Sequence, residues 1–480
     1  NNGALMKFIN RKTELETLAK YYLTAKKKLF PVVIMGLRRV GKTRLVLEFT
    51  RDKRYLYFYV NPNKRSMDLL REFSRLIKGK FSLPKYIEIR DWSTFIEVLF
   101  EFGSNWIIIF DEFQYFEKVA PEVLGELQKQ IDLKEDRPIL QIFVGSIIGM
   151  MKNIFEDKAR PLYDRVKAKM RIKPFDFRNS ILLMKEIGIK EFDKMLKLYL
   201  LLGGYPKYYV SIYDLLLQDK EISEIIDVLF LGEDAPYRNE GRILLGDSER
   251  RVYYSIIEAI AAGKKKLSDI SAYTGIKQNS LSKYLGELTN YFEIVVRRYP
   301  ITEGPRSKRG RYFLSDPFYT FWFRYVHPNI DLIELGDIES LKRMVLDELE
   351  HYVSKFFEDI VRDTLLAASG RFGKDYGMPV MTKIGAWWDR RGNEIDIVGM
   401  CGDKIVLVGE IKYSSRPVTA RDIIRFIEKL RFIRAKGAAR VYVSKQGFTK
   451  GALEALDEEN VIGLRLRDLV DVWERLSAAT

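Results

Sequence analysis

An eight-residue stretch, GLRRVGKT from Gly36 to Thr43, has the residue types and spacing of a loop that holds phosphate groups. Its glycines let backbone N–H groups turn toward phosphate oxygens, and Lys42 adds a positive charge beside them. The hydroxyl of Thr43 suits a magnesium ion that accompanies the nucleotide. An apolar strand precedes this P-loop and a helix follows it, which is the context the pattern requires. The stretch therefore predicts a site for ATP and Mg²⁺.

Acidic and polar residues end the next apolar strands. Asp111 and Glu112 close WIIIFDEFQ, where one carboxylate holds the magnesium shell and the second orients the attacking water. Ser146 follows ILQIFVG, so its hydroxyl is predicted either to contact the γ-phosphate or to cap the next helix, and both interpretations stay open. Farther along, Arg160 and Arg165 in ARPLYDRV are either phosphate contacts across a subunit interface or solvated surface cations.

A second set of chemically capable residues lies near the far end of the chain, in IVLVGEIKY. Alternate side chains of a strand share a face, so Glu410 and Lys412 are expected to point the same way. Asp396, in NEIDIVG, falls on a neighbouring predicted strand. Two carboxylates can hold a divalent ion, and a lysine can position water or stabilise charge on a phosphate. The alternative is a strand ion pair that contributes little to stability.

The N-terminal half of the chain resembles the archaeal AAA+-type ATPases of the STAND class, specifically the MNS clade. The resemblance rests on FINRKTELETL, the P-loop, FDEFQ, VGS, PLYDR and LGGYPKYY, in this order. It implies that the stretch from Arg11 to Glu14 lies by the nucleotide and that Gly204, Tyr205 and Pro206 touch it from a helical lid. Asp164 departs from the family, which more often has glycine before the arginine. The predicted nucleotide-binding residues are Arg11, Gly36, Arg39, Val40, Gly41, Lys42, Thr43, Arg44, Ser146, Arg165 and Pro206.

The C-terminal part resembles the PD-(D/E)xK nucleases, with Asp396 as the motif aspartate and Glu410-Ile411-Lys412 as the E-x-K. No proline precedes the aspartate, a departure that is common in that superfamily. An acid on a helix often completes such sites, and Glu358 in KFFEDIV matches it. The resemblance implies catalysis by Asp396, Glu410 and Lys412, with metal bound by Glu358, Asp396 and Glu410. Archaeal ATPases of the clade named above often carry such a domain.

The segment between these two parts is predicted to be mostly helical. Apolar spacing from about Phe177 to Gln218, interrupted by GGYP, suits a lid over the nucleotide. Three further helices, then a strand, a basic loop and a strand, predict a winged helix. If it binds DNA, the contacting residues are Lys277, Gln278, Asn279, Ser280 and Lys283 on the groove-facing helix and Arg306, Lys308, Arg309 and Arg311 on the wing. A protein-interaction or structural role is the alternative. The aromatic stretch DPFYTFWFRYVHP is interpreted as core.

Composition narrows the partners and the compartment. The formal charge of +15, with both signs well mixed, favours polyanions, nucleic acid first, and solubility alone is the other explanation. One cysteine and two histidines argue against a disulfide framework and a zinc cluster. Apolar runs stay shorter than the ~20 residues of a membrane span, so we expect a cytoplasmic protein without a membrane partner.

The predicted fold is therefore a multidomain α/β protein. It consists of a P-loop NTPase core of the AAA+ type at residues 6–175, a helical lid at 176–245, a winged helix at 246–325 and a restriction-endonuclease-like α/β domain at 326–480. The leading hypothesis is an ATP-hydrolysing switch that positions a DNA-binding module and a Mg²⁺-dependent DNA endonuclease. The alternatives are a regulatory or scaffold ATPase whose last domain binds nucleic acid or protein without cutting, and a sensor that assembles into an ATP-dependent homo-oligomer in response to a protein signal.

Overall fold

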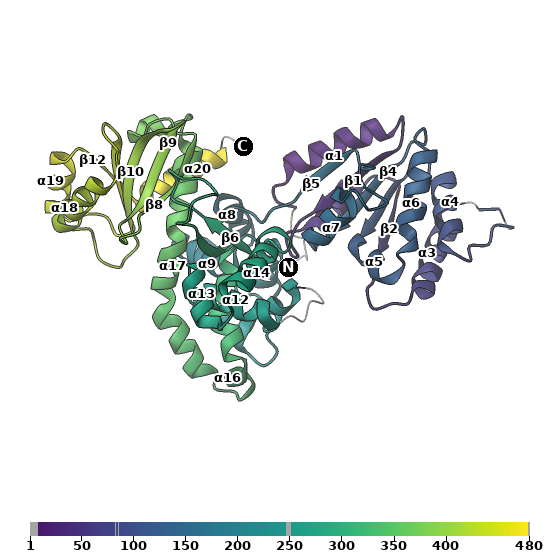
Figure 1. The fold of residues 1–480 in the computed structure, drawn as a ribbon, viewed down its shortest axis with the longest axis horizontal. Helices are drawn as coiled ribbons and strands as arrows, with labels where there is room; N and C mark the ends of the chain where they lie inside the picture. The colour runs from purple at the N-terminus through teal and green to yellow at the C-terminus, as the bar shows by residue number, and fades with distance from the viewer. Residues whose placement is uncertain (1–7, 82, 85, 246–250, 479–480) are drawn as a thin grey trace.

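A computed structural model describes residues 8–81, 83–84, 86–245 and 251–478. It contains an N-terminal α/β unit, a helical middle and a C-terminal sheet, and the long helix α17 (Ile338–Ala368) runs from the middle to that sheet (Figure 1). Of the predicted domain boundaries, residue 6 lies outside the described residues, and the boundary at 245/246 adjoins residues outside them.

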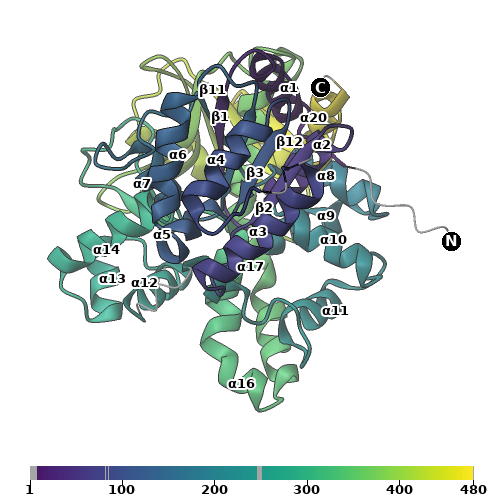
Figure 2. The same ribbon diagram turned by 90° about the vertical axis from the view of Figure 1, so that its right-hand side faces the viewer.

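The N-terminal unit is a five-stranded parallel sheet in the order β2-β3-β4-β1-β5. Its inner strands are mostly apolar and almost entirely buried because helices cover both faces of the sheet, as Figure 2 shows. The carboxyl ends of parallel strands meet at one edge, so the residues that follow β1, β3 and β4 are brought together. The strands are β1 (Phe30–Met35), β2 (Tyr55–Tyr59), β3 (Ile107–Asp111), β4 (Leu140–Gly145) and β5 (Ala168–Arg171). The helices are α1 (Lys12–Ala25), α2 (Lys42–Thr50), α3 (Ser66–Lys80), α4 (Trp92–Phe102), α5 (Phe116–Val119), α6 (Glu122–Leu133) and α7 (Ile148–Glu156).

A helical unit follows and is held against the first unit through the GGYP segment. The N–H of Phe175 donates to the carbonyl of Gly204 at 2.7 Å, and a Cβ at Gly204 would lie 1.8 Å from the carbonyl oxygen of Phe175. Glycine is therefore required at position 204, because only a bare backbone can approach so closely. The helices are α8 (Phe177–Glu186), α9 (Phe192–Leu202), α10 (Pro206–Asp214) and α11 (Ile222–Ile226), and the irregular turns η2 (Asp227–Leu231) and η3 (Glu240–Leu245) complete the unit.

A three-helix unit with a two-stranded hairpin comes next. It comprises α12 (Arg251–Ala261), α13 (Leu267–Thr274), α14 (Gln278–Asn290), β6 (Val295–Arg298) and β7 (Arg311–Leu314). The unit contacts the N-terminal unit at the end of α14, where Glu293 forms ion pairs with Lys152 of α7, at 2.8 Å, and with Arg171 of β5. It also contacts the C-terminal sheet through the loop between β6 and β7, called the wing loop below (residues 299–310).

The aromatic stretch after β7 is core, as the sequence predicted. Phe318, Tyr319, Phe321 and Trp322 are at most 1% exposed, and the indole N–H of Trp322 donates to the carbonyl of Tyr237 at 3.0 Å. These residues belong to α15 (Pro317–Phe321) and η4 (Trp322–Val326), which lead through η5 (His327–Asn329) and α16 (Ile330–Glu334) to α17.

The C-terminal sheet has the strand order β12-β11-β10-β9-β8. Its strands β8, β9 and β10 are antiparallel, whereas β10, β11 and β12 are parallel. Helices α18 and α19 cover one face and α17 covers the other (Figure 1). The elements are β8 (Lys383–Trp388), β9 (Glu394–Cys401), β10 (Lys404–Lys412), α18 (Ala420–Lys429), β11 (Ala439–Ser444), α19 (Lys450–Glu458), β12 (Val461–Arg465) and α20 (Leu466–Ala478), with the short turns η6 (Gly373–Tyr376) and η7 (Leu430–Phe432).

Helix α20 returns to the helical unit. The ring of Trp473 stacks on Phe192 and meets the edge of Phe177, with ring centroids 5.1 and 5.0 Å apart. The last helix therefore joins two parts of the chain that sequence alone assigns to separate domains. In the described part of the chain, none of the helices is both long enough and apolar enough to cross a membrane.

Asp316 makes a testable contribution to stability. Its carboxylate accepts the N–H of Phe318 at 2.8 Å, and burial raises its pKa to about 7. The folded protein then holds a proton that the unfolded chain releases near pH 4, so this contribution is present at acid pH and is lost as the pH rises to 7. We expect the stability advantage of the wild type over Asp316→Asn to shrink by roughly 3 kcal/mol between pH 5 and pH 8. Thermal unfolding of both proteins at each pH measures it, and a constant difference would contradict the shifted pKa.

Candidate functional site

The P-loop joins β1 to α2, and Lys42 is the first residue of that helix. Lys42 is buried, at 6% exposure, and its ammonium group donates to the carbonyl of Leu37 at 3.0 Å, within the loop itself. Burial lowers the pKa of Lys42 to about 8, against the opposing attraction of Glu112 and Asp111. Gly41 has a φ of 91°, which glycine tolerates. The loop therefore holds a buried cation at the amino end of a helix, where phosphate groups bind.

Asp111 lies beside this loop, at the end of β3. One of its oxygens accepts the hydroxyl of Thr43 at 2.6 Å and the hydroxyl of Tyr57 at 2.6 Å. Desolvation, and next the charge of Asp111, raise the pKa of Tyr57, so the phenol stays a donor. The predicted metal-binding pair of Thr43 and Asp111 is thus in direct contact.

Glu112 is held in place by Ser146, the residue that follows β4. The hydroxyl of Ser146 and the amide of Gln114 both donate to one carboxylate oxygen of Glu112, at 2.6 and 2.5 Å. Glu112 has a φ of 56°, a left-handed conformation that non-glycine residues rarely adopt. Such strain persists only where the surrounding structure holds the residue in place. Here the hydrogen bonds from Ser146 and Gln114 hold the carboxylate of Glu112 at the edge of the phosphate loop.

Arg11 connects the P-loop to the helical unit. Its guanidinium group donates to the carbonyls of Val40, at 3.3 Å, and Lys173, at 2.6 Å, and it lies 4.5 Å from the ring centroid of Phe175. Phe175 in turn is bonded to Gly204, and Pro206 begins α10 two residues later. The structure therefore brings the predicted residues Arg11, Val40 and Pro206 into one connected region.

Two other predicted nucleotide ligands have protein partners. Arg39, with a φ of 68°, forms a two-pronged ion pair with the buried carboxylate of Glu240, at 2.8 and 3.1 Å. Its pKa is raised, first by this hydrogen bond. Arg44 lies 3.7 Å from Glu48, one turn along α2. Arg39 therefore ties the phosphate loop to the helical unit.

The two downstream arginines also pair with carboxylates. Arg165 contacts Asp132 through two nitrogens at 3.0 Å, and Arg160 lies 3.3 Å from Glu117. Asp164 has a φ of 58°, the conformation in which glycine is favoured, which explains the residue type expected at that position. Both arginines thus pair with carboxylates outside the P-loop.

The carboxylates of the C-terminal sheet also meet. Asp396 on β9 accepts the N–H of Ile411 at 3.0 Å, and Ile411 lies between Glu410 and Lys412 on β10. One oxygen of Glu410 is paired with Lys429 of α18, and the other is buried without a hydrogen-bond partner among the described residues. Burial raises the pKa of both carboxyl groups, and the charge of Asp396 adds to the rise at Glu410.

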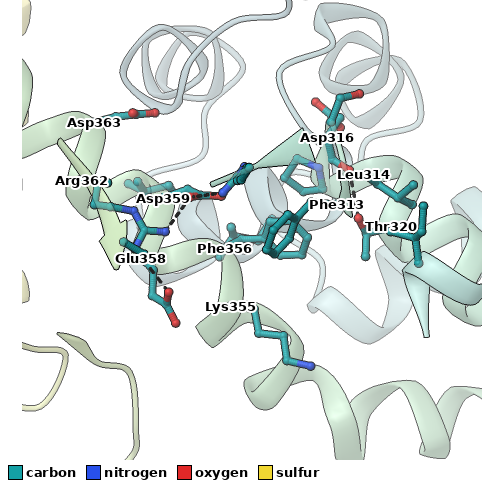
Figure 3. Close-up of a pocket in the computed structure, with 18 of the residues that line it drawn as sticks. Phe313, Leu314, Asp316, Thr320, Lys355, Phe356, Glu358, Asp359, Arg362 and Asp363 are labelled. Carbon is teal, nitrogen blue, oxygen red and sulfur yellow. Dashed lines mark hydrogen bonds and ion pairs between the residues drawn. The ribbon is translucent and has the colours of Figure 1, made fainter. Parts of the chain in front are cut away.

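The remaining residues of the predicted triad point to other partners. Lys412 lies 2.9 Å from Asp422 of α18. Glu358 on α17 is half-buried, and partial desolvation raises its pKa, with the charge of Asp396 as the second cause. Arg362 lies between Glu358, at 3.4 Å, and Asp359, at 2.7 Å, as Figure 3 shows, and it also donates to the carbonyl of Asp396. Within the described residues, no three His, Cys, Asp or Glu side chains are grouped closely enough to hold a metal ion.

Asp396 and Glu358 lie at a cavity of about 1160 Å³ between the units (Figure 3). Its wall includes Asp396, Glu358 and Lys429 at the C-terminal sheet, and Arg298 from β6. Arg298 donates to Asp359 at 2.7 and 2.9 Å, which joins the hairpin of the three-helix unit to α17. The second acidic site is therefore enclosed partly by the three-helix unit.

The predicted wing contacts need a correction. Arg309 donates to the carbonyl of Trp388 at 2.9 Å and pairs with Glu303, and Arg311 lies 3.1 Å from Glu394. These two arginines hold the hairpin to the C-terminal sheet, so they are not free for phosphate. The predicted helix residues, in contrast, are all exposed: Lys277, Gln278, Asn279, Ser280 and Lys283.

Sequence reasoning missed several partners at both sites. Tyr57, Gln114 and Glu240 contact the ATPase residues, and Arg362 and Lys429 contact the second acidic pair. Only Gln114 carried a local signal, because it stands two positions after Glu112 in FDEFQ. The other four lie far along the chain from the groups that they contact.

Family comparisons match both ends of the chain. Residues 8–212 match a family described as "ATPase domain predominantly from Archaea", and this range contains the P-loop, Asp111, Glu112 and Ser146. Residues 322–423 match a family described as "Archaea bacterial proteins of unknown function", and this range contains Glu358, Asp396 and Glu410.

Individual proteins extend the match over nearly the whole chain. "Uncharacterized protein MJECL04" of Methanocaldococcus jannaschii is 32% identical over 434 residues, which cover 88% of this chain and 91% of that protein. The Walker-type ATPase PABY2304 of Pyrococcus abyssi is 20% identical with a TM-score of 0.50, over 66% of this chain and 96% of that one. The Aeropyrum pernix ORC2 protein has a TM-score of 0.46 at 14% identity, over 72% and 98%. The likeness to PABY2304 shows a P-loop ATPase fold, and the chain belongs to the archaeal P-loop ATPase family that includes the M. jannaschii protein.

Proposed function

We propose that this ATPase is a switch that couples ATP hydrolysis to DNA binding and to Mg²⁺-dependent cleavage of DNA. One observation carries the cleavage half: a buried oxygen of Glu410 lacks a hydrogen-bond partner in the described chain, beside the carboxyl group of Asp396. A buried carboxylate oxygen is costly unless a donor or cation satisfies it. A divalent ion between these two carboxylates would do so.

The ATPase half follows from the first site. Thr43 and Asp111 have the hard oxygen donors that Mg²⁺ prefers and lie within 2.6 Å of each other. Lys42 would neutralise charge on the transferred phosphate, and Glu112, fixed by Ser146, would orient the attacking water. We infer that the core is an AAA+-type member of the STAND class in which the helical unit acts as a lid. Arg39 of the P-loop pairs with Glu240 of that unit, and Arg11 stacks on Phe175, which is bonded to Gly204.

The three-helix unit would supply the DNA contact. Its helix order and hairpin fit a winged helix, and the amino end of α14 presents exposed polar and basic side chains as a groove-reading helix does. Lys277 and Lys283 would then contact phosphates or bases. The formal charge of +15 supports a polyanionic partner.

At the second site, the residues would divide the work of phosphodiester hydrolysis. Asp396 and Glu410 would hold Mg²⁺, which supplies Lewis-acid activation of water and phosphate. Lys429 or Lys412 would then stabilise charge on the phosphate, once released from Glu410 and Asp422. Hydrolysis forms one P–O bond to the water oxygen and breaks one to the sugar oxygen, which takes up a proton. Glu358 on α17 would support the metal or its water.

The second candidate function is a scaffold ATPase whose last domain binds without cutting. Its support is that Lys412 pairs with Asp422 and Lys429 pairs with Glu410, so both cations already have protein partners. An ion-paired network of this kind can remain after catalysis has been lost. In this case the C-terminal unit would hold nucleic acid or a protein, and ATP would govern assembly into a homo-oligomer.

A cleavage assay separates the two functions. We expect nicks or breaks when the full chain is incubated with ATP and Mg²⁺ on supercoiled, linear, branched and single-stranded DNA, and none when EDTA replaces Mg²⁺. Phosphate release in the same tubes reports the ATPase. Hydrolysis of ATP with every DNA left intact would favour the scaffold.

A further inference from the structure

A basic groove lies where the wing loop meets the turn between β8 and β9. It has a volume of about 460 Å³ and is lined by residues from two units of the chain: Glu303, Ser307, Lys308, Arg309, Asp389, Arg390 and Arg391. The turn residues lead into β9, the strand that carries Asp396. The groove is therefore separate from the carboxylates but continuous with their strand.

Reciprocal hydrogen bonds hold the two sides of this groove together. Arg309 donates to the carbonyl of Trp388, and the indole of Trp388 donates to the carbonyl of Arg309, both at 2.9 Å. The N–H of Ile301 donates to the carbonyl of Ala386 at 3.0 Å. Arg311 lies 4.6 Å from the centroid of the Trp388 ring. A site fixed in this way pays little ordering cost when it binds a ligand.

The acidic side chains of the groove leave three of its basic side chains free to bind a ligand. Glu303 is paired with Arg309 and accepts the hydroxyl of Ser307. Asp389 accepts the backbone N–H groups of Arg391 and Asn393 and the side-chain amide of Asn393, which lowers its pKa. Lys308, Arg390 and Arg391, by contrast, are exposed, and the described structure gives them no acidic partner. Because Glu303 and Asp389 are both bonded to neighbouring groups, the charges of Lys308, Arg390 and Arg391 face solvent around the groove.

We propose that this groove binds the sugar–phosphate backbone of DNA and leads it toward Asp396. The inference rests on the proposed function for its partner but concerns a different set of residues. Arginine and lysine around a hollow recognise phosphate groups without reading bases. The proposal also changes the roles of the predicted wing residues. Arg309 and Arg311 hold the groove to the C-terminal sheet, while Lys308 and the β8–β9 turn supply its phosphate contacts.

The distance to the second acidic site suits this path. Asn393 ends the turn and Asp396 lies three residues farther along β9, which spans about 10 Å at a strand rise of about 3.3 Å per residue. Duplex DNA advances about 3.4 Å per base pair, so about three base pairs would cover that span. A backbone held in the groove would therefore have to extend by only about three base pairs to reach the carboxylates.

The test is the salt dependence of DNA binding by the full chain in EDTA, where no cleavage occurs. Fluorescence anisotropy of a short labelled duplex is measured for the wild type and for Arg390→Ala/Arg391→Ala. Each lost phosphate contact lowers the slope of log K against log salt by about 0.9, so we expect a slope shallower by about 2 and binding weaker by about tenfold to hundredfold near 0.1 M salt. Arg390→Lys/Arg391→Lys should keep the wild-type slope.

The matched control is Lys27→Ala/Lys28→Ala, which removes two exposed cations just beyond α1. The proposal for the groove would be overturned if the slope were unchanged in the arginine variant. It would also be overturned if the lysine control lost as much affinity as the arginine variant. Loss in the arginine variant alone supports the groove even if the wild type never cuts DNA, an outcome that would refute the nuclease only. Absence of DNA binding by the wild type would overturn both proposals.

Discussion

Replacement of Lys42 by alanine is expected to lower the turnover number for ATP by about 10²- to 10³-fold, the cost of removing one preorganised charge partner from a transition state. Lys42 is buried at the amino end of α2, where water cannot substitute for its charge. Its pKa near 8 in the structure reflects desolvation, and a bound triphosphate would raise that pKa again because an opposite charge favours the ammonium form. Phosphate release under saturating ATP measures the effect.

The control for this prediction lies just past the other end of the same helix. Lys53 donates to the carbonyl of Phe49 and pairs with Asp52, so Lys53→Ala removes an equal charge without touching the loop. We expect it to retain turnover within about twofold, because Lys53 lies outside the phosphate loop and its partner Asp52 is exposed to solvent. If Lys42→Ala and Lys53→Ala lose turnover equally, the effect comes from stability and not from the phosphate site.

The first site was predictable because its signals are local. A parallel sheet brings strand ends to one edge, so the P-loop after β1, Asp111 at the end of β3 and Ser146 after β4 could be placed together without coordinates. Of the two interpretations of Ser146, the helix cap is not formed, because its hydroxyl donates to Glu112 and the N-cap of α7 is Ile147. Contact of Ser146 with the γ-phosphate stays a prediction. Asp396 likewise lies on β9, which pairs with the strand of Glu410, and its carboxylate accepts the N–H of Ile411.

Partner choice among long charged side chains was not predictable. Arg39 meets Glu240 across 201 positions of sequence, and Arg309 and Arg311 meet the C-terminal sheet, because packing between units decides which carbonyl or carboxylate lies within reach. Lys412 shares a strand face with Glu410, yet it pairs with Asp422 because α18 covers that face. The alternation of side chains along a strand determines the face of the sheet on which each side chain lies, but not the charged group with which it pairs.

Contacts between the units also join the two sites. Glu293 binds Arg171 beside the P-loop sheet, and five residues later Arg298 binds Asp359. Arg362 then bridges Asp359 to the backbone of Asp396. The segment from Glu293 to Arg298 thus links the ATPase core to α17, and Arg362 of α17 contacts the strand of the second acidic site. A movement of the three-helix unit during ATP turnover would act on the wall of that site.

Replacement of Asp396 by asparagine is expected to abolish DNA cleavage while ATP hydrolysis stays within about twofold of the wild type. Asparagine keeps the oxygen that accepts the N–H of Ile411 but removes the negative charge that would hold Mg²⁺ with Glu410. The loss of several kcal/mol of metal assistance corresponds to about a 10³-fold slower cut.

Asp403→Asn, in the exposed turn between β9 and β10, removes the same charge from the same hairpin and should cut normally. Gel assays of supercoiled DNA, with phosphate release followed in parallel, measure both activities. Cleavage that survives in Asp396→Asn, or that disappears equally in Asp403→Asn, would mean that the bond is cut elsewhere on the protein.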